Sequence, residues 1–284
     1  MRVAVIGKKG QLARALKDEV QTDSYHFIGS KELDITDAKA VDFYFKQHSF
    51  DVIINCAAYT NVDGAEDDQA AAKALNHTAV THLVDQCKKY QMRLVHISTD
   101  YVFDGKANAP YIEEATCNPI SVYGQTKREG ELEILQSDVE ALIIRTTWLY
   151  SAYAHNFVKT MLKLAASNTH LKVVSDQIGR PTYANDLAEA LIALVNRTQE
   201  WPKGPSVYHF SNLGQCSWAD FARAIFKTQK LEVEVKNCDS TAFPTKAQRP
   251  QYSVLDLSKI QSHFQLVPRP WEAALAACIK KLSI

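Results

Sequence analysis

The stretch from Val3 to Ala13 reads Val-Ala-Val-Ile-Gly-Lys-Lys-Gly-Gln-Leu-Ala. Its first four residues are apolar and predict a short buried strand, and the apolar residues of 11–19 recur at helical spacing. Gly7 and Gly10 therefore lie between a strand and a helix, where glycine permits a tight turn and the helix N-terminus offers free N–H groups to an anion. The spacing is GxxGxxA rather than GxGxxG, so a plain strand-to-helix turn is the alternative to a dinucleotide site.

Strand-like and helix-like segments alternate through the rest of the first half. Such alternation is typical of βαβ units, whose strands form a parallel sheet covered by helices on both faces. We therefore expect an α/β protein with a Rossmann-type, doubly wound parallel sheet. The predicted strands are 3–6, 25–28, 51–54, 93–97 and 141–144, and the predicted helices are 11–19, 70–90 and 121–135.

The pattern becomes less regular after Trp148, which indicates a smaller, mixed α/β substrate domain built from separate segments. We expect residues 1–149 and 184–213 to form the NAD(P)-binding Rossmann domain, and residues 150–183 and 214–284 to form the substrate domain. The later predicted helices are 156–166, 184–195, 218–228 and 271–282, and the later predicted strands are 171–175, 207–210 and 233–236.

Composition narrows the class of protein. Lysine plus arginine equals aspartate plus glutamate at 32 each, which argues against a nucleic-acid partner, since such proteins usually carry a basic excess. The six cysteines are scattered without a CxxC pair, so structural zinc is not indicated and reduced thiols are expected. With neither a signal-peptide pattern nor an apolar run near ~20 residues, we expect a cytoplasmic protein that does not enter a membrane.

The end of the second predicted strand bears on the choice of cofactor. An acidic side chain there favours NAD by bonding the ribose hydroxyls, whereas basic side chains accommodate the extra phosphate of NADP. Ser30 and Lys31 occupy this place. We therefore favour NADPH, with NADH tolerated; the alternative for Lys31 is a solvated surface lysine.

Tyr123 and Lys127 stand four residues apart on a predicted helix, and such residues share one face. A tyrosine has an ordinary pKa near ~10. A neighbouring ammonium favours the phenolate and lowers that pKa, so the pair could donate a proton to a carbonyl that receives hydride. The lysine could also hold the ribose of the nicotinamide. The alternative is a chance pair on the surface.

Thr99 follows the strand predicted for 93–97, at the sheet edge where open α/β sheets bind ligands. Its hydroxyl could bond a substrate oxygen beside Tyr123, whereas a turn or helix cap is the alternative. A strand-end hydroxyl followed some twenty residues later by YxxxK is more specific than either feature alone. His96 and His209 lie in strand-like contexts and are expected to be core residues.

Taken together, the motifs resemble the dTDP-4-dehydrorhamnose reductases, a family of extended short-chain dehydrogenases/reductases. The resemblance covers nearly the whole chain. It rests on Gly7 to Leu12, Asn55 to Asp63, Ser98 to Phe103, Tyr123 to Lys127, Arg145 to Tyr150, Asn156 to Met161, Asp176 to Thr182 and Arg249-Pro250.

The resemblance implies NAD(P)H-dependent reduction of the C4 keto group of a dTDP-sugar, giving dTDP-L-rhamnose, with Thr99, Tyr123 and Lys127 as the catalytic set. It implies further roles for residues around the cofactor and the substrate. The pyrophosphate would be held by Gly7, Gly10, Gln11 and Leu12, the adenine by Asp34 and Ile35, and the ribose and nicotinamide by Cys56, Ala57, Ala58 and Tyr59. The sugar nucleotide would face Asp100, Tyr101, Trp148 and Asn156, with Arg249 on its diphosphate.

Some alternatives stay open. Trp148 could instead be a core aromatic, and Arg249 could form a surface ion pair. Ala13, Ser151 and Arg180 depart from the family pattern, and Arg180 bears most on the identity of the sugar. A related epimerase or dehydratase and a non-catalytic regulatory subunit are the competing functions; Thr99, Tyr123 and Lys127 together argue against the last. We expect no metal, a sugar-nucleotide substrate, and a monomer or homodimer.

Overall fold

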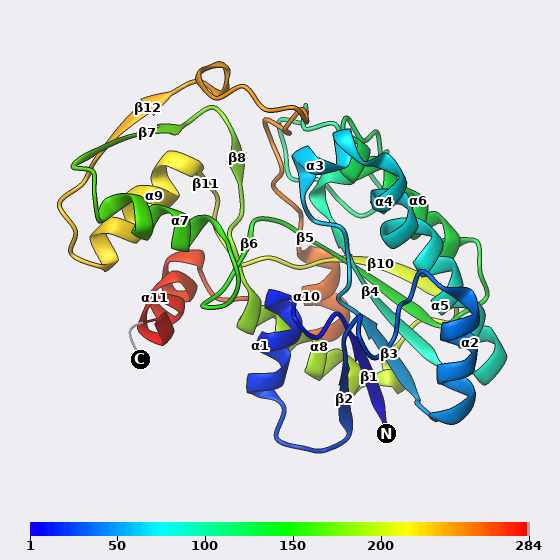
Figure 1. Ribbon diagram of the computed structural model, residues 1–284. Coiled ribbons are helices and arrows are strands. Elements are labelled where there is room, and N and C mark those ends of the chain that lie inside the picture. The colour runs from blue at the N-terminus through cyan, green and yellow to red at the C-terminus, as the bar shows by residue number, and fades with distance from the viewer. Residues whose placement is uncertain (283–284) are drawn as a thin grey trace.

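The sheet that the alternation predicts is present in the computed structural model, which describes residues 1–282. Six parallel strands lie in the order β10–β5–β4–β3–β1–β2, which confirms the predicted fold class. Figure 1 shows this sheet in the larger of two lobes. The strands are β1 (Val3–Ile6), β2 (Tyr25–Ile28), β3 (Val52–Asn55), β4 (Arg93–Thr99), β5 (Ala141–Thr146) and β10 (Pro205–His209).

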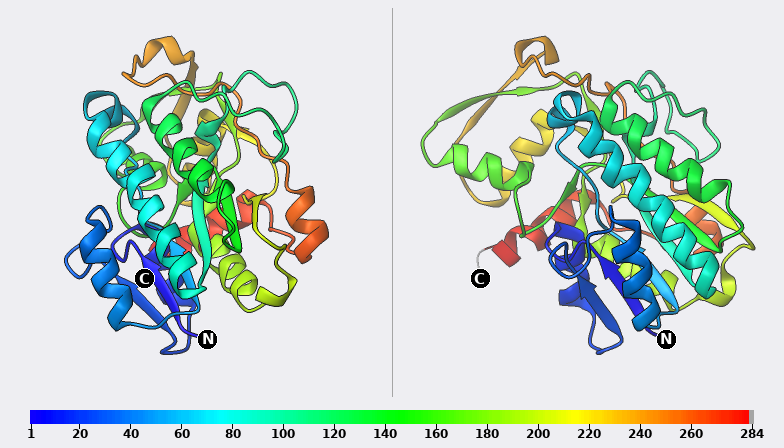
Figure 2. Two further views of the ribbon diagram at one scale, coloured as in Figure 1. Left: turned by 90° about the vertical axis from the view of Figure 1, so that its right-hand side faces the viewer. Right: turned by 45° about the vertical axis from the view of Figure 1, so that its right-hand side comes forward.

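Helices cover both faces of the sheet, and its central strands are therefore buried on both sides. The views in Figure 2 show α5 and α6 running side by side. One face packs against α1 (Gln11–Glu19), α8 (Ala184–Val195) and α10 (Ser258–Phe264). The other packs against α2 (Ala38–Gln47), α5 (Ala79–Tyr90) and α6 (Val122–Leu135).

The strand order places the chain turn after β1 beside the turn after β3. Gly7 ends β1 with a φ of +95°, a conformation that favours glycine. A Cβ at this position would lie 2.8 Å from the backbone nitrogen of Ala57, just after β3. Gly7 therefore lets the two turns approach closely at the carboxyl edge of the sheet, where open α/β sheets bind ligands.

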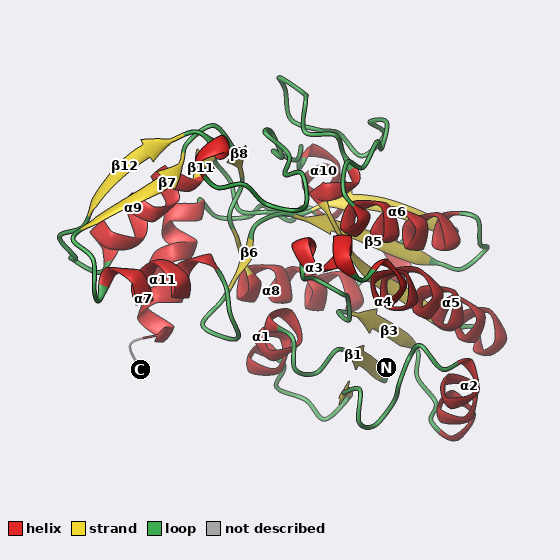
Figure 3. Ribbon diagram, turned by 45° about the horizontal axis from the view of Figure 1, so that its top comes forward, coloured by secondary structure: helices red, strands yellow, loops and turns green. Residues whose placement is uncertain are grey.

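The smaller lobe has its own apolar core between helices and short strand pairs. Figure 3 shows the β7–β12 pair lying over its helices. The helices are α7 (Phe157–Ala165), α9 (Trp218–Thr228) and α11 (Trp271–Leu282). The strand pairs are β7 (His170–Val174) with β12 (Glu234–Cys238), β8 (Ile178–Gly179) with β11 (Cys216–Ser217), and β6 (Leu149–Tyr150) with β9 (Thr182–Tyr183).

The helix predicted for 70–90 is interrupted. It consists of α4 (Gln69–Lys73), a π-helical turn η1 (Ala74–Thr78) and α5, preceded by α3 (Val62–Asp67). Apolar spacing alone does not reveal a π turn, because one turn with an extra residue barely disturbs the pattern. The sequence pattern also did not predict α2, α10, β6, β8, β9 or β11.

The tail of the chain does not stay within the smaller lobe. Leu255, Leu257, Ile260 and Phe264 are buried in the core cluster of the large sheet. The expected division of the chain into two domains remains a proposal. We propose one change to it, which assigns residues 255–264 to the Rossmann domain. Within residues 1–282, no helix has the length and apolar character needed to cross a membrane.

Candidate active site

Three residues that the sequence spacing singled out share one cavity. This inner cavity, of about 390 Å³, lies between the first turn of α1, the turn after β3, the end of β4 and the start of α6. Thr99 ends β4, and Tyr123 and Lys127 lie on α6; all three line the cavity. The hydroxyl of Ser121 caps α6 by accepting from the N–H of Gly124. This cap fixes where the helix begins, and so where Tyr123 lies.

Tyr123 is half-buried, and its ring forms a T-shaped pair with that of Tyr101 at a centroid distance of 5.4 Å. Burial raises the pKa of Tyr123 above its ordinary value, so the lowering expected from Lys127 was wrong for the free protein; a hydrogen bond with Thr99 acts against the rise. The phenol therefore carries its proton at neutral pH. A protonated phenol that opens onto a cavity is a candidate proton donor.

Lys127 is buried, with only 1% of its surface exposed. Its Nζ donates to the carbonyl oxygen of Ile97 at 2.7 Å and lies 3.1 Å from Nε2 of His96. Burial lowers the pKa of Lys127 to about 8, although the carboxylate of Glu131 acts against this. The lysine can therefore change charge near neutral pH. His96, expected to be a plain core residue, is thus a neighbour of the candidate catalytic lysine.

Asp100 stands directly behind Thr99 and is 3% exposed. Thr99 Oγ1 donates to one of its carboxylate oxygens at 3.0 Å, and Thr147 Oγ1 donates to the other at 3.1 Å. Burial raises the pKa of Asp100 to about 6, and the hydrogen bonds from Thr99 and Thr147 limit this rise. Asp100 lines the inner cavity, and its observed contacts orient the hydroxyl of Thr99.

The first turn of α1 presents free N–H groups to the inner cavity. Gly10 is the N-cap residue and supplies no side-chain cap, and Gly10, Gln11 and Leu12 all line the cavity. The side chain of Leu12 belongs to the core. Gln11 Nε2 donates to the carbonyl oxygen of Leu149 at 3.3 Å, and its Oε1 accepts from Ser151 Oγ at 3.0 Å. The side chain of Gln11 thus ties the two lobes together and leaves its backbone for a ligand.

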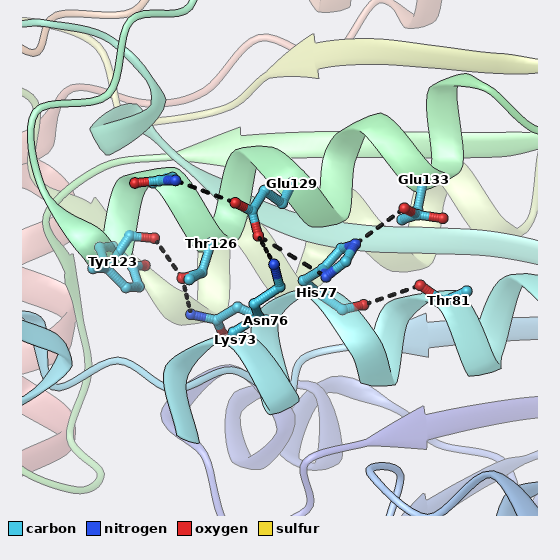
Figure 4. A network of polar contacts seen from close by, with 9 residues as sticks. Lys73, Asn76, His77, Thr81, Tyr123, Thr126, Glu129 and Glu133 are labelled. Atoms are coloured by element: carbon cyan, nitrogen blue, oxygen red, sulfur yellow. Dashed lines mark hydrogen bonds and ion pairs between the residues drawn. The ribbon is translucent and has the colours of Figure 1, made fainter. Parts of the chain in front are cut away.

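The turn after β3 is held by the π-helical turn. Cys56 and Ala58 line the inner cavity. The amide of Asn76, in η1, accepts from the N–H of Tyr59 at 2.8 Å and donates to its carbonyl oxygen at 3.2 Å. Its Nδ2 also donates to Thr126 Oγ1 at 3.1 Å, and Figure 4 shows the amide directed toward this residue of α6. One buried amide thereby joins the cofactor-side turn to the helix of Tyr123.

Close packing supports this junction. A Cβ at Gly130 would lie 2.2 Å from the backbone oxygen of Asn76, so α6 can approach the π turn only with glycine there. On the outer side, His77 Nε2 lies 3.0 Å from a carboxylate oxygen of Glu133 (Figure 4). The sequence analysis missed Asn76; its one signal is a polar residue on the apolar face of a predicted helix.

The residues expected near the adenosine lie after β2. Ser30 and Lys31 are exposed there. The carboxylate of Asp34 accepts from the N–H and the hydroxyl of Thr36, and these bonds lower the pKa of Asp34. The side chain of Ile35 is buried in the core. This segment is therefore a folded turn whose exposed side faces away from the sheet.

Glu32 is an acidic residue in the same turn that the sequence analysis did not consider. Its carboxylate accepts from the N–H of Gly29 at 2.6 Å and pairs with Lys8 at 2.9 Å. The hydrogen bond from Lys8 is the main reason that the pKa of Glu32 is lowered. The pair joins the turns after β1 and β2, which both border the expected cofactor path.

Arg249 lies where the two lobes meet. Its Nη1 donates to the hydroxyl of Tyr101 at 3.0 Å, and its Nη2 donates to a carboxylate oxygen of Asp63 at 2.7 Å. Nearby, Lys246 pairs with Asp67. Two carboxylates of α3, those of Asp63 and Asp67, therefore bind the segment 240–251.

A larger cavity, the outer cavity of about 760 Å³, lies between α7, β7 and residues 240–251. Trp218 lines it and stacks on Trp148, which lines the inner cavity, at a centroid distance of 3.4 Å. Trp148 has a φ of +46° and is half-buried. Most other side chains that line the outer cavity are apolar, and several are cationic. Among them are Phe157, Met161, Phe243, Lys106, Lys172 and Arg249.

Two other singled-out residues lie elsewhere. Asn156 lines neither cavity: it caps α7 by accepting from the N–H of Lys159, and its Nδ2 donates to the carbonyl oxygen of Ser151. Its predicted contact with a sugar stays a prediction. Arg180 Nη1 donates to the carbonyl oxygen of Leu255 at 2.8 Å, so this departure from the family pattern anchors the tail.

Comparison with known proteins shows the family of this chain. Residues 1–284 match the family described as the RmlD substrate binding domain. The chain is 40% identical to a dTDP-4-dehydrorhamnose reductase of Aggregatibacter actinomycetemcomitans over 96% of this chain and 97% of that protein. It is 38% identical to the spore coat polysaccharide biosynthesis protein SpsK of Bacillus subtilis, over 99% and 98% of the two chains.

Solved structures agree as well. The crystal structure of dTDP-4-dehydrorhamnose reductase from Bacillus anthracis in complex with NADP superposes with a TM-score of 0.93 at 34% identity, covering 99% of both chains. The resemblance predicted from the motifs is therefore confirmed. Since the family match spans the whole chain and its relatives cover almost their full length, this protein belongs to the dTDP-4-dehydrorhamnose reductase (RmlD) family of oxidoreductases.

Proposed function

We propose that the protein reduces the C4 keto group of dTDP-4-dehydro-6-deoxy-L-mannose to give dTDP-L-rhamnose, with NADPH as the preferred cofactor and NADH tolerated. The observation that carries this proposal is the meeting of Thr99, Tyr123 and Lys127 at the inner cavity, beside the first turn of α1. When bound, NADPH supplies the hydride. We place this activity in the cytoplasm.

The residues around the inner cavity fit a dinucleotide. Gly7 leaves open the space that a Cβ would fill against Ala57, and the uncapped start of α1 offers N–H groups to a pyrophosphate. We assign the cofactor to Gly7, Gly10, Gln11, Leu12, Cys56, Ala57, Ala58 and Tyr59, with Asp34 and Ile35 toward the adenine. Ser30 and Lys31 are exposed where the extra phosphate of NADPH would lie.

The chemistry of the chain's own residues follows from their contacts. Tyr123, a phenol that burial keeps protonated, gives its proton to the oxygen that becomes negative at C4. We assign to Thr99 a hydrogen bond to that oxygen, for which its hydroxyl turns its one proton away from Asp100, the acceptor in the free protein. The ammonium form of Lys127 stabilises the phenolate that Tyr123 leaves behind.

The outer cavity is suited to the nucleoside diphosphate. Its apolar walls can hold a base, and Arg249 can bind phosphate oxygens bidentately. Tyr101 bonds Arg249 and lines the inner cavity, so the two cavities adjoin at this pair. A substrate could therefore extend from its diphosphate at Arg249 to its sugar at Tyr123, passing Trp148.

The direct test is oxidation of NADPH and of NADH with enzymatically prepared dTDP-4-dehydro-6-deoxy-L-mannose, in the wild type and in Tyr123→Phe. Rapid oxidation that disappears in the variant would support both the chemistry and the substrate, and the ratio of the two rates would decide the cofactor. Absence of oxidation, with cofactor binding retained, would move the function to another keto-sugar or to a regulatory role. A cofactor that stays bound through purification and is not consumed would favour an epimerase or dehydratase.

A further inference from the structure

A chain of buried hydrogen bonds runs from the turn after β3 to Lys127. The N–H of Ala57 donates to Oδ1 of Asn55 at 3.1 Å, and Nδ2 of Asn55 lies 3.2 Å from Nδ1 of His96. Nε2 of His96 then lies 3.1 Å from Nζ of Lys127, which also donates to the carbonyl oxygen of Ile97. Asn55 and His96 are 1% and 0% exposed, so water does not compete for these contacts.

The first bond in this chain determines the rest. A backbone N–H can donate only to the oxygen of the Asn55 amide, so the amide nitrogen must face His96. That nitrogen is a donor, and Nδ1 of His96 therefore accepts. Burial lowers the pKa of His96 well below its ordinary value, so the ring is uncharged and carries its one proton on Nε2.

The proton on Nε2 of His96 points at Lys127. An ammonium group has donors only, whereas an uncharged amine has a lone pair that can accept. We propose that His96 is a positioning residue that donates from Nε2–H to the uncharged amine of Lys127 and thereby favours that form. The inference rests on the proposed role of Lys127, whose proton it makes easier to release.

The other ionisable groups that face Lys127 do not offer such a contact. Glu131, one helical turn on, favours the ammonium, but its carboxylate is already bound by Arg145 at 2.8 Å and by Arg128 at 2.7 Å. Cys56 is uncharged at neutral pH, because burial raises its pKa to about 12. Tyr123 is protonated for the same reason. His96 is therefore the neighbour that most directly opposes the charge on Lys127.

The contact can be tested on the wild-type protein, without substrate, by ¹⁵N NMR of histidine-labelled protein from about pH 6 to about pH 9. We expect His96 to carry its proton on Nε2 throughout, and its Nε2 resonance to shift in one step as Lys127 titrates. The step should be absent in Lys127→Met, and His209, buried on another strand, should not show it. A proton on Nδ1, a charged ring, or an unchanged step in Lys127→Met would overturn the inference.

Two variants separate positioning from packing. The amide nitrogen of a glutamine can replace Nε2 of histidine, whereas asparagine is too short to reach Lys127. We expect His96→Gln to keep the wild-type pH profile, because its amide nitrogen can still donate to the uncharged amine. In His96→Asn the alkaline fall of kcat/KM should move up by about one pH unit, because the uncharged amine loses its donor. An alkaline fall that stays at the wild-type pH in both variants would show that His96 only fills space. Failure of the proposed substrate would leave the NMR result standing.

Discussion

The inner cavity and the segment 240–251 of the outer cavity are built from different kinds of contact. Around the inner cavity, Thr99, Asp100 and Lys127 are 5%, 3% and 1% exposed, and hydrogen bonds hold all three side chains. The segment 240–251 is held partly by Lys246 and Asp67, whose side chains are 62% and 60% exposed. Exposed ion pairs contribute only about 0–1 kcal/mol, whereas buried hydrogen bonds specify geometry. The chemistry should therefore depend on the first region and substrate affinity on the second.

Replacement of Tyr123 should break the first region most completely. Tyr123→Phe keeps the ring and its packing but removes the proton donor, so we expect kcat to fall by about a thousandfold. The binding of NADPH, followed by fluorescence titration, should change little. Turnover near the wild-type rate would rule out Tyr123 as the acid.

Replacement of Arg249 should act on binding instead. Arg249→Gln removes the charge that we assign to the diphosphate, and KM for the sugar nucleotide should rise by about ten- to hundredfold with a smaller change in kcat. Lys246→Gln is the matched control, because it removes an exposed cation from the same segment. Steady-state kinetics that show equal effects in both variants would contradict a specific role for Arg249.

The pH dependence tests the charge of Lys127. Its pKa is lowered to about 8, so the ammonium is present below that pH and lost above it. If the ammonium supports Tyr123, kcat/KM should be level below about pH 8 and fall by about tenfold per unit above it. The check is a rate profile over this range with a separate test that the protein stays folded. A profile that is flat to high pH would show that the charge is not needed.

Ser151 links the two regions, and its removal should have the smallest effect. Ser151→Gly deletes the hydroxyl that donates to Gln11, in the first turn of α1. One hydrogen bond of this kind contributes about 1 kcal/mol, so KM for NADPH should rise by no more than about fivefold. Steady-state kinetics with varied NADPH should show an unchanged kcat. A large loss of kcat would mean that the hydrogen bond between Ser151 and Gln11 also orders the candidate catalytic residues.

The sheet could be predicted from the sequence because its strands are short, carry runs of apolar residues and alternate with helical segments. The helices 11–19, 184–195, 218–228 and 271–282 match the predicted bounds. The short pairs such as β6–β9 and β8–β11 could not be predicted, since two residues carry no periodic pattern. The division of the tail between the two lobes stays a proposal, and the apolar face of α10 does not reveal from sequence alone that it packs on the large sheet.

The site was partly predictable for a similar reason. Tyr123 and Lys127 are linked by helical spacing, and Thr99 by its place at a strand end. Asn76 and Asp63 act through contacts with residues far along the chain, to Thr126 and Arg249, which no local pattern records. Sequence patterns therefore indicated the candidate reacting groups but not the residues that contact them.

The π turn between α4 and α5 makes the number of residues in this segment as important as their kind. An α-helix advances by about 100° per residue, so deletion of one residue from 74–78 would rotate one end of the segment against the other by that amount. Either Asn76 would leave Tyr59, or Leu83 and Val84 would leave the core. Over evolutionary time this helix can exchange side chains, but it cannot change its length by one without losing one of its two partners.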